Sequence, residues 1–189
     1  MYKQDLHIHT VFSKRDRAIV PQQTLELISW TKHAKIVGIS DHFEYLRGKT
    51  FEIYKSSVSR FGFYCGTEVD GHKEAERAVD YEFDYFVYHC FDRTKDYKGA
   101  EKLLSTGKPV IIAHPNALGT DLNKVPSDCL VEINNRYVWR SDWQESIGPF
   151  ARKFKFVFSS DAHQPNWLNQ EISIRVADDL GIAETILFA

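Results

Sequence analysis

The sequence predicts an α/β fold with a parallel sheet, either open or closed into a barrel. Short apolar runs alternate with helix-like segments about seven times along the 189 residues. The run at residues 110–113 (VIIA) is continuously apolar, as expected for a strand that is buried on both faces. Such an alternation implies parallel strands joined by helices. We find no glycine-rich phosphate-binding fingerprint after any expected strand, which disfavours a dinucleotide-binding fold.

Seven segments are expected to be strands because each is short and largely apolar: residues 2–9, 36–40, 61–65, 85–89, 110–114, 130–134 and 154–160. A last run, 185–188, is either a strand or a tail. Pro21 can open the first helix. The later helices are expected near residues 50–60, 73–81, 97–105, 141–153 and 166–180, and Gly148-Pro149 is expected to break the fourth of these segments. Gly181 fits the position just after the last of them.

The bulk composition fits one domain over residues 1–189. A net charge of -2 disfavours an extended nucleic-acid-binding surface. We see no signal-peptide pattern and no apolar run long enough to span a membrane, so we expect a cytoplasmic protein without a membrane partner. Cys65, Cys90 and Cys129 are widely spaced and form no CxxC pair, which predicts free thiols in a reducing compartment.

Histidines gather at the ends of the expected strands. Six of the eight lie at the C-terminal end of a strand or just after it: His7, His9, His42, His89, His114 and His163. Glu68 and Asp161 follow the third and seventh expected strands. In a (β/α) barrel the active site is built from these strand ends and the loops after them. The pattern therefore predicts that these side chains share one face of a barrel.

This combination of side chains predicts a metal site. His7 and His9 are two residues apart on a strand, so their side chains point the same way, about 6–7 Å apart. Imidazoles bind transition metals, and carboxylates can bridge two ions. Six imidazoles with Glu68 and Asp161 exceed the four ligands of a closed zinc site. We expect two or three metals with shared carboxylates; a lone strand-end histidine would more often be structural.

Five motifs resemble those of the PHP (polymerase and histidinol phosphatase) superfamily. They are DLHIHT (5–10), ISDH (39–42), GTE (66–68), AHP (113–115) and SDAH (160–163). They come in the order of that family and extend over nearly the whole chain. The resemblance implies a distorted (β/α)7 TIM-like barrel, two or three divalent metal ions (Zn, Mn or Fe), and the hydrolysis of phosphate esters.

The resemblance also implies how the ligands divide among the metals. The first metal would take His7, His9, Glu68 and Asp161. The second would share Glu68 and add His89 and His114. The third would take His42, His163 and one ligand from the loop after the first strand. Asp41 would orient a ligand or a loop, with a helix N-cap as the alternative.

The loop after the first strand departs from the family pattern. Members commonly place Asp or His directly after the serine or one residue later, whereas Ser13 is followed by Lys14 and Arg15, and the acid comes at Asp16. Either the loop bulges and Asp16 is the ligand, or the third site is weakened or empty. A cation at Lys14 or Arg15 could instead offset the anionic site or bind phosphate. We expect Asp16 to be the ligand, with a surface charge cluster as the alternative.

The expected reaction is hydrolysis of a phosphate ester by a metal-activated hydroxide. The expected catalytic residues are Glu68, Asp161 and His163, of which the last two could pass a proton to the leaving alcohol. Cations on the same face could hold the phosphoryl oxygens; the candidates are Lys14, Arg15, Arg136 and Arg140. Several aromatics after the strands, among them Tyr137, Trp139 and Trp167, could shape a substrate pocket, although core packing is the more common role.

Three functions compete on this evidence. A phosphatase for a small phosphomonoester, similar to histidinol phosphatase, is favoured because the compact chain has few insertions with which to hold a polymer. A nuclease or phosphodiesterase would use the same metals on a nucleotide diester, and a basic groove would favour it. A non-catalytic metal-binding PHP domain would lack ligands, and only one of about nine is in doubt here. The sequence identifies neither the substrate nor the oligomeric state.

Overall fold

Seven parallel strands form one sheet in the computed structural model, which describes residues 1–188. The order of the strands in the sheet follows their order in the sequence. They are β1 (Tyr2–Asp5), β2 (Ala34–Ile39), β3 (Tyr64–Asp70), β4 (Tyr85–His89), β5 (Val110–Ile112), β6 (Leu130–Asn134) and β7 (Lys155–Ser159). Parallel neighbours need a crossover connection, and the helices between the strands supply it.

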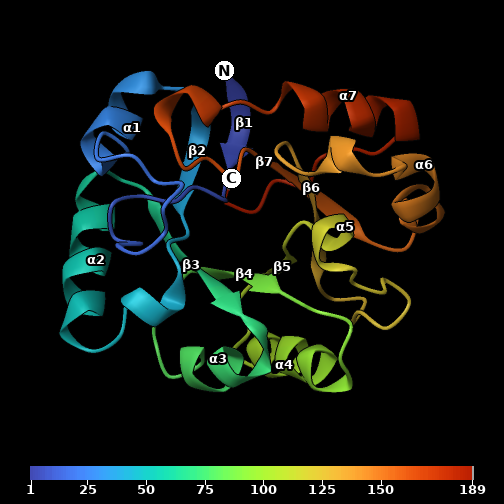
Figure 1. Cartoon of the computed structure of the whole chain (residues 1–189), viewed down its shortest axis with the longest axis horizontal. Coiled ribbons are helices and arrows are strands. Elements are labelled where there is room, and N and C mark those ends of the chain that lie inside the picture. Colours follow the sequence, from blue (N-terminus) through green and yellow to red (C-terminus); the bar gives the residue numbers. More distant parts are fainter. Residues whose placement is uncertain (189) are drawn as a thin grey trace.

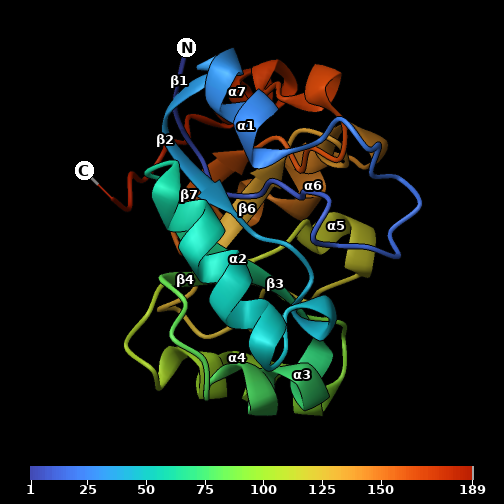
Figure 2. The same ribbon diagram turned by 90° about the vertical axis from the view of Figure 1, so that its left-hand side faces the viewer.

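The helices surround the strands (Figure 1). They are α1 (Leu25–Thr31), α2 (Lys49–Arg60), α3 (Gly71–Ala78), α4 (Thr94–Leu104), α5 (Pro115–Leu118), α6 (Trp143–Ser146) and α7 (Glu171–Leu180). Four short 3-10 turns are added at η1 (Phe43–Tyr45), η2 (Val138–Arg140), η3 (Gly148–Phe150) and η4 (Pro165–Trp167). In Figure 2 the long loop between β1 and α1 lies on one side of the molecule and the tail at residues 185–188 on the other.

The first and last strands close the sheet into a nearly complete barrel. A parallel bridge pairs Ile8 with Ala162 beyond the ends of β1 and β7. Between β1 and β7 themselves, the Gln170 side-chain amide donates hydrogen bonds to the backbone carbonyls of Gln4 and Phe158, at 2.9 and 3.2 Å. We call this junction of the first and last strands the seam. The predicted α/β, TIM-like barrel of seven parallel strands is thereby confirmed.

The side chains inside the barrel form two layers. The lower layer is apolar and contains Leu6, Tyr85, Val87, Ile111, Ala113, Leu130 and Val157. Alternate residues of a strand face the same side, so the residues two places further along continue upward from this layer. On β4 that residue is His89, and on β6 it is Glu132. The lower layer is the floor of the barrel, and the C-terminal strand ends form its mouth.

Tyr85 fills the floor beneath β2 and β3. Its hydroxyl donates to the Leu6 carbonyl at 2.7 Å. A Cβ atom at Gly66 would lie 2.2 Å from the Tyr85 ring, and one at Gly38 would lie 2.3 Å from its hydroxyl oxygen. Only glycine leaves room for the ring at these two positions, so the two strands can pass close to it.

Several element boundaries differ from the prediction. The third strand lies at Tyr64–Asp70 instead of residues 61–65, which places Glu68 inside the strand. The first strand ends at Asp5, and this explains why the successive residues Leu6 and His7 both face the interior. A regular pleat would have sent them to opposite faces.

The first helix begins at Leu25 and not at Pro21. The hydroxyl of Thr24 accepts the Leu27 N–H at 3.2 Å and caps the helix. The segment at 141–153 is divided into α6 and η3, and the break predicted at Gly148-Pro149 is thereby confirmed. Near the C-terminus, Glu184 forms a single bridge with Phe156, and residues 185–188 form a tail instead of a strand.

Two expectations from composition can be compared with the structure. Among the described residues, none of the helices is long and apolar enough to cross a membrane. Cys65, Cys90 and Cys129 are buried free thiols, as their spacing predicted. Burial raises the pKa of each thiol to about 12, which keeps all three protonated at neutral pH.

Candidate metal centre

One cluster at the barrel mouth contains all nine predicted ligands. A cavity of about 310 Å³ opens onto it and is lined by Asp16, His42, Glu68, His89, His114, Asp161 and His163 together with Arg136 and Tyr137. His7 and His9 lie just below, each only 1% exposed. The strand-end residues are thus brought together as the sequence predicted, and their role as metal ligands stays a prediction.

Glu68 lies at the centre of the cluster. Its Oε1 is 3.1 Å from His7 Nε2, 2.5 Å from His89 Nε2 and 3.6 Å from His114 Nε2. Its Oε2 is 2.9 Å from His42 Nδ1 and 3.4 Å from His9 Nε2. A single carboxylate that faces five imidazoles from its two oxygens is suited to bridge metal ions.

Two compact groups of potential ligands share His7. One contains His7, His9 and Asp161, in which Asp161 Oδ1 lies 3.7 Å from Nε2 of each histidine. The other contains His7, Glu68 and His114. His89 adjoins the second group, because its Nε2 is 3.1 Å from His114 Nε2. His7 thus belongs to both groups, and the division of the ligands among the metals stays a prediction.

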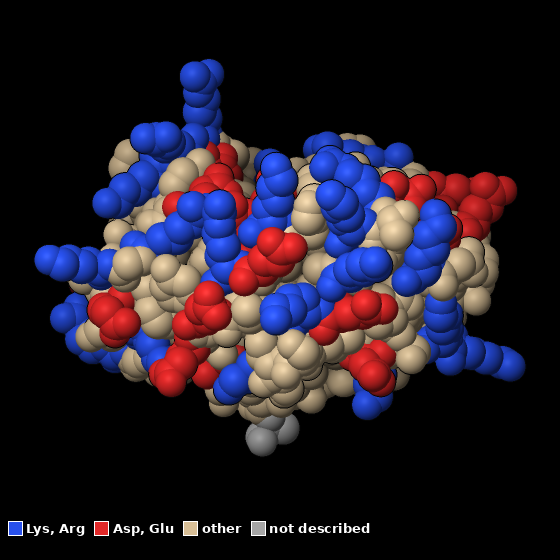
Figure 3. Space-filling model, turned by 90° about the horizontal axis from the view of Figure 1, so that it is seen from below, with Lys and Arg blue, Asp and Glu red and all other residues tan. Residues whose placement is uncertain are grey.

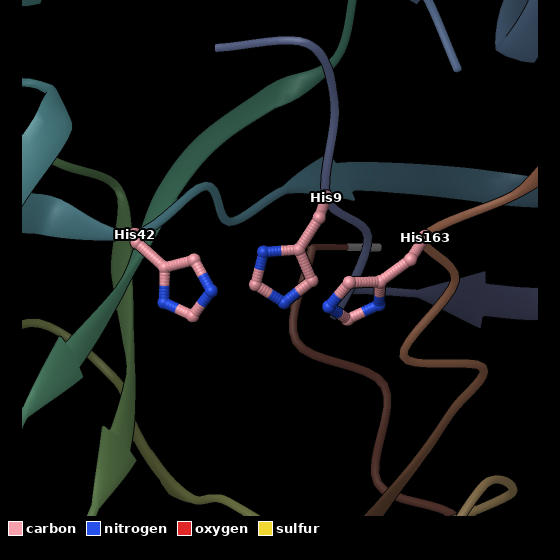
Figure 4. Close-up of side chains that lie close together, drawn as sticks. All are labelled: His9, His42 and His163. Carbon is pink, nitrogen blue, oxygen red and sulfur yellow. The ribbon is translucent and has the colours of Figure 1, made fainter. Parts of the chain in front are cut away.

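A third group contains His9, His42 and His163. The three rings stand in a row with His9 in the middle (Figure 4), at centroid distances of 4.6 Å to His42 and 4.2 Å to His163. Asp16 completes the group: its Oδ2 lies 3.0 Å from His163 Nε2 and 3.4 Å from His42 Nε2. The loop therefore bends so that Asp16 faces this group, as the first of the two predicted alternatives required.

Asp41 explains how the loop reaches that position. Its carboxylate accepts the backbone N–H and the hydroxyl of Thr10, at 2.7 and 2.6 Å. It also accepts the N–H and hydroxyl of Ser13, at 3.1 and 2.6 Å. The Ser13 hydroxyl in turn accepts the His42 N–H at 3.0 Å. Asp41 thus orients the loop, and the alternative of a helix N-cap is not what the structure shows.

Two further carboxylates fix the histidine rings, and the sequence interpretation missed their roles. Glu132 Oε1 accepts a hydrogen bond from His7 Nδ1 at 2.7 Å, and its Oε2 accepts one from the backbone N–H of His114 at 2.6 Å. Asp70 Oδ1 lies 3.3 Å from His89 Nδ1. Carboxylates that hold the second nitrogen of a metal-binding histidine are common in metalloproteins. The only signal in the sequence was an acidic residue, Glu132, in the middle of the otherwise largely apolar strand expected at 130–134.

The hydrogen bonds of this cluster fit a bound cation. When His7 Nδ1 donates to Glu132, the Nε2 of a neutral ring carries a lone pair. That Nε2 faces Glu68 Oε1 and, at 3.1 Å, His9 Nε2. Three acceptors therefore converge, and a proton or a metal ion must lie among them. His9 Nδ1 is also buried without a hydrogen-bond partner.

The pKa shifts describe the same charge balance. Burial would lower the pKa of His89, but the charges of Glu68 and Asp70 raise it to about 9. Burial likewise opposes the charged form of His42, yet Glu68 and Asp16 raise its pKa to about 11. Against its own burial, Glu68 has a pKa well below the usual range because His89 and the other imidazoles stabilise its negative charge. The carboxylates thus favour positive charge at the mouth.

Two residues of the cluster have unusual backbone geometry. His114 has a φ of 23° and Asp161 a φ of 52°, both in the left-handed region. Side chains other than glycine rarely adopt such angles, and strain of this kind concentrates at functional sites. Each lies two residues after a strand, His114 after β5 and Asp161 after β7, and both side chains line the cavity.

The predicted phosphate-binding cations separate into two pairs. Arg136 lines the cavity, with Nη1 3.6 Å from Asp161 Oδ1. Arg140 lies next to it, with its guanidinium 4.8 Å from the Tyr137 ring. Lys14 and Arg15 are exposed and line a different, open depression with Tyr45 and Arg47. The structure therefore brings Arg136 to the cluster and places the two loop cations outside the cavity lining.

Comparison with known proteins supports the fold. No protein-family model matches the chain, and no curated protein sequence matches it. The similar solved structures include phospho-2-dehydro-3-deoxyheptonate aldolase (DAHP synthase) from Thermotoga maritima, with 15% identity, a TM-score of 0.51 and 96% of this chain covered. The chain spans 57% of the length of that protein. A truncated form of the enzyme, 3-deoxy-D-arabino-heptulosonate 7-phosphate synthase, matches with 14% identity, a TM-score of 0.51 and 72% coverage of its chain. At this identity the likeness concerns the barrel fold alone.

Proposed function

We propose that this chain is a metal-dependent phosphoesterase of the PHP type that hydrolyses a small phosphomonoester. The observation that supports it best is the cavity in which four histidines, Asp16, Glu68 and Asp161 meet one arginine, with His7 and His9 just below. The acidic and imidazole groups suit divalent cations, whereas the guanidinium suits an anion. A ligand with a phosphoryl group would satisfy both at once.

The metal ions would be held in the groups described above. His7, His9, Glu68 and Asp161 would hold the first, Glu68, His89 and His114 the second, and Asp16, His42 and His163 the third. Such ions lower the pKa of bound water and neutralise charge on phosphoryl oxygens. Glu132, Asp70 and Asp41 would keep the rings and the loop in place.

The protein's own side chains would position the ester. Arg136 is stacked between two aromatic rings, with its guanidinium carbon 4.8 Å from the centre of Trp167 and 5.1 Å from that of Tyr137. A guanidinium held in this way can donate two parallel hydrogen bonds to phosphoryl oxygens. In the reaction a water oxygen bonds to phosphorus, the ester P–O bond breaks, and the leaving alkoxide gains a proton. That proton would come from the attacking water, passed across the cavity that Asp161 and His163 line.

A polymeric substrate is less well supported. Figure 3 shows the side on which α3 and α4 lie, and there blue and red side chains alternate instead of forming one basic surface. The net charge of -2 points in the same direction. We therefore do not propose hydrolysis of a nucleotide diester or a non-catalytic metal-binding role. The experiment below distinguishes both from the proposed function.

The decisive experiment is metal analysis followed by turnover of mono- and diesters on one preparation. We expect bound Zn, Mn or Fe, and monoester hydrolysis that disappears with a chelator and returns when the metal is restored. The variant His9→Ala should lose this activity, and His33→Ala should keep it. His33 pairs with Asp5 outside the cluster, so it is a matched control. Metal without turnover of either ester class would contradict the proposal, as would full activity in His9→Ala.

A further inference from the structure

Five side chains beside the metal centre form an alternating stack of rings and guanidinium groups. Arg136 contacts the rings of Trp167 and Tyr137, and Arg140 contacts the rings of Tyr137 and Trp139, at 4.8 and 5.2 Å. The order is therefore Trp167, Arg136, Tyr137, Arg140, Trp139. Each arginine between two rings is held in place by cation–π contacts and shape.

The stack leads from the metal cluster to the surface. At its inner part, the Tyr137 ring is 4.8 Å from the His114 ring, and the Trp167 ring is 6.0 Å from that of His163. At its outer end, Trp139 is 54% exposed. A large aromatic side chain left in solvent beside a functional cavity is an available contact surface.

A second cavity of about 350 Å³ lies along this stack. It is lined by Arg136, Trp139, Arg140, Ser160, Asn166 and Trp167, among others. We call it the Trp139 pocket. It shares Arg136 with the metal cavity, so one ligand can reach both. Its volume lies within the usual range for small-molecule sites.

One buried polar group in the wall of the Trp139 pocket has no partner. The Ser160 hydroxyl makes no hydrogen bond in the protein although the residue is 2% exposed. A buried hydroxyl without a partner is costly, and a ligand group that bonds to it would remove that cost. Ser160 lines the Trp139 pocket and directly precedes Asp161, which lines the metal cavity. The exposed amide of Asn166 adds another hydrogen-bonding group.

We propose that the Trp139 pocket binds the alcohol part of the substrate, and that this part carries a planar heteroaromatic ring, as a nucleoside monophosphate does. The indole of Trp139 offers a face for stacking, while Ser160, Asn166 and Arg140 offer hydrogen bonds to ring heteroatoms. Arg136, at the junction, holds the phosphoryl end. This substrate assignment rests on the proposed phosphoesterase function.

Kinetics with matched substrates test the assignment. The metal-loaded protein should hydrolyse a purine nucleoside 5′-monophosphate with a kcat/KM at least about tenfold above that for glycerol 3-phosphate, since one stacked ring contributes that much. Trp139→Ala should remove this preference, because it should raise the KM for the nucleoside monophosphate more than the KM for glycerol 3-phosphate. The control Trp30→Ala should change neither, because Trp30 is a 70% exposed indole on α1. Equal use of both substrates by the unmodified protein, or a parallel loss in Trp139→Ala, would overturn the assignment.

Binding of the nucleoside alone separates this assignment from the proposed reaction. The purine nucleoside has no phosphate, so its binding, read by tryptophan fluorescence, does not depend on hydrolysis. We expect weaker binding to Trp139→Ala and to Ser160→Ala, whose stability should match that of the unmodified chain because the lost hydroxyl has no partner. Nucleoside binding without any ester turnover would refute the phosphoesterase and keep the pocket. Ester turnover without nucleoside binding would refute the pocket and keep the phosphoesterase.

Discussion

The floor and the mouth of the barrel are built by the same strands but differ in every physical respect. On β4, Val87 packs in the apolar floor, and His89, two residues later, faces Glu68. On β6 the same step leads from Leu130 to Glu132. Two residues along a strand thus separate close apolar packing from a group of buried charges. The floor has all its partners within the chain, whereas the acceptors of the mouth converge on spaces that suit cations.

This difference implies that the two layers contribute differently to stability. The floor should stabilise the protein whether or not metal is present. The mouth holds strained residues, buried carboxylates and polar atoms without partners, which are costly until a ligand arrives. Such a trade of stability for function is common at active sites.

Glu68→Gln gives the largest expected effect on the mouth. The amide would keep the shape of the side chain and remove the charge that faces five imidazoles. We expect the metal content to fall and the rate of hydrolysis to drop more than about a hundredfold. This exceeds the usual loss of activity when a residue that only hydrogen-bonds a metal ligand is removed. The rise in melting temperature on adding metal should also disappear. Elemental analysis, turnover and thermal melts measure the three effects, and retained metal content would contradict the bridging role.

Gly66→Ala tests the floor. Its new Cβ would lie 2.2 Å from the buried Tyr85 ring, so the ring or the strand must move. We expect a loss of about 3 kcal/mol in the free energy of unfolding, equal with and without metal. Gly148→Ala is the control, since the nearest atom there is 3.4 Å away. Denaturant melts in metal and in chelator provide the comparison; a loss confined to the metal-loaded form would mean that the two layers are coupled.

Local signals in the sequence predicted a parallel α/β sheet and most of the cluster, whereas the choice of a closed barrel over an open sheet came from the family resemblance. Apolar runs of strand length and polar residues at their ends depend only on neighbours along the chain. Glu132 was different: its partner His7 is 125 residues away and on another strand, so the contact requires the curvature of the closed sheet. The Trp139 stack likewise depends on the 3-10 turn η2, which the sequence does not indicate.

The boundaries of β1 and β3 were missed for a related reason. The alternation of His7 and His9 suggested a regular strand, but β1 ends at Asp5, and beyond it Ile8 forms a single bridge with Ala162 at the seam. The reach of β3 to Asp70 follows from its long pairing with β4, from Gly66 opposite Tyr85 to Asp70 opposite His89. Pairing across a barrel overrides local preference in both places.

Glu132→Gln should give an intermediate effect on the mouth. The variant keeps the volume of the side chain but weakens the hydrogen bonds to His7 Nδ1 and to the backbone N–H of His114. We expect metal affinity to fall by about 10–100-fold, the usual effect of losing a carboxylate behind a histidine ligand. Competition with a metal chelator of known affinity measures this change. An unchanged affinity would show that Glu132 only fills space between β6 and β1.

Asp16→Asn should give the smallest effect and decides the role of the loop. Asp16 touches His42 and His163 and lies at the rim, partly exposed, so its loss should leave the first two groups of ligands complete. We expect one metal ion fewer per chain, with stability changed by less than about 1 kcal/mol, as for a substitution at the surface. Asp128→Asn, at an exposed position far along the chain, is the control. If the metal count stays the same, the imidazoles of His9, His42 and His163 suffice for the third ion. Asp16 then only forms ion pairs with His42 and His163 and is not a metal ligand.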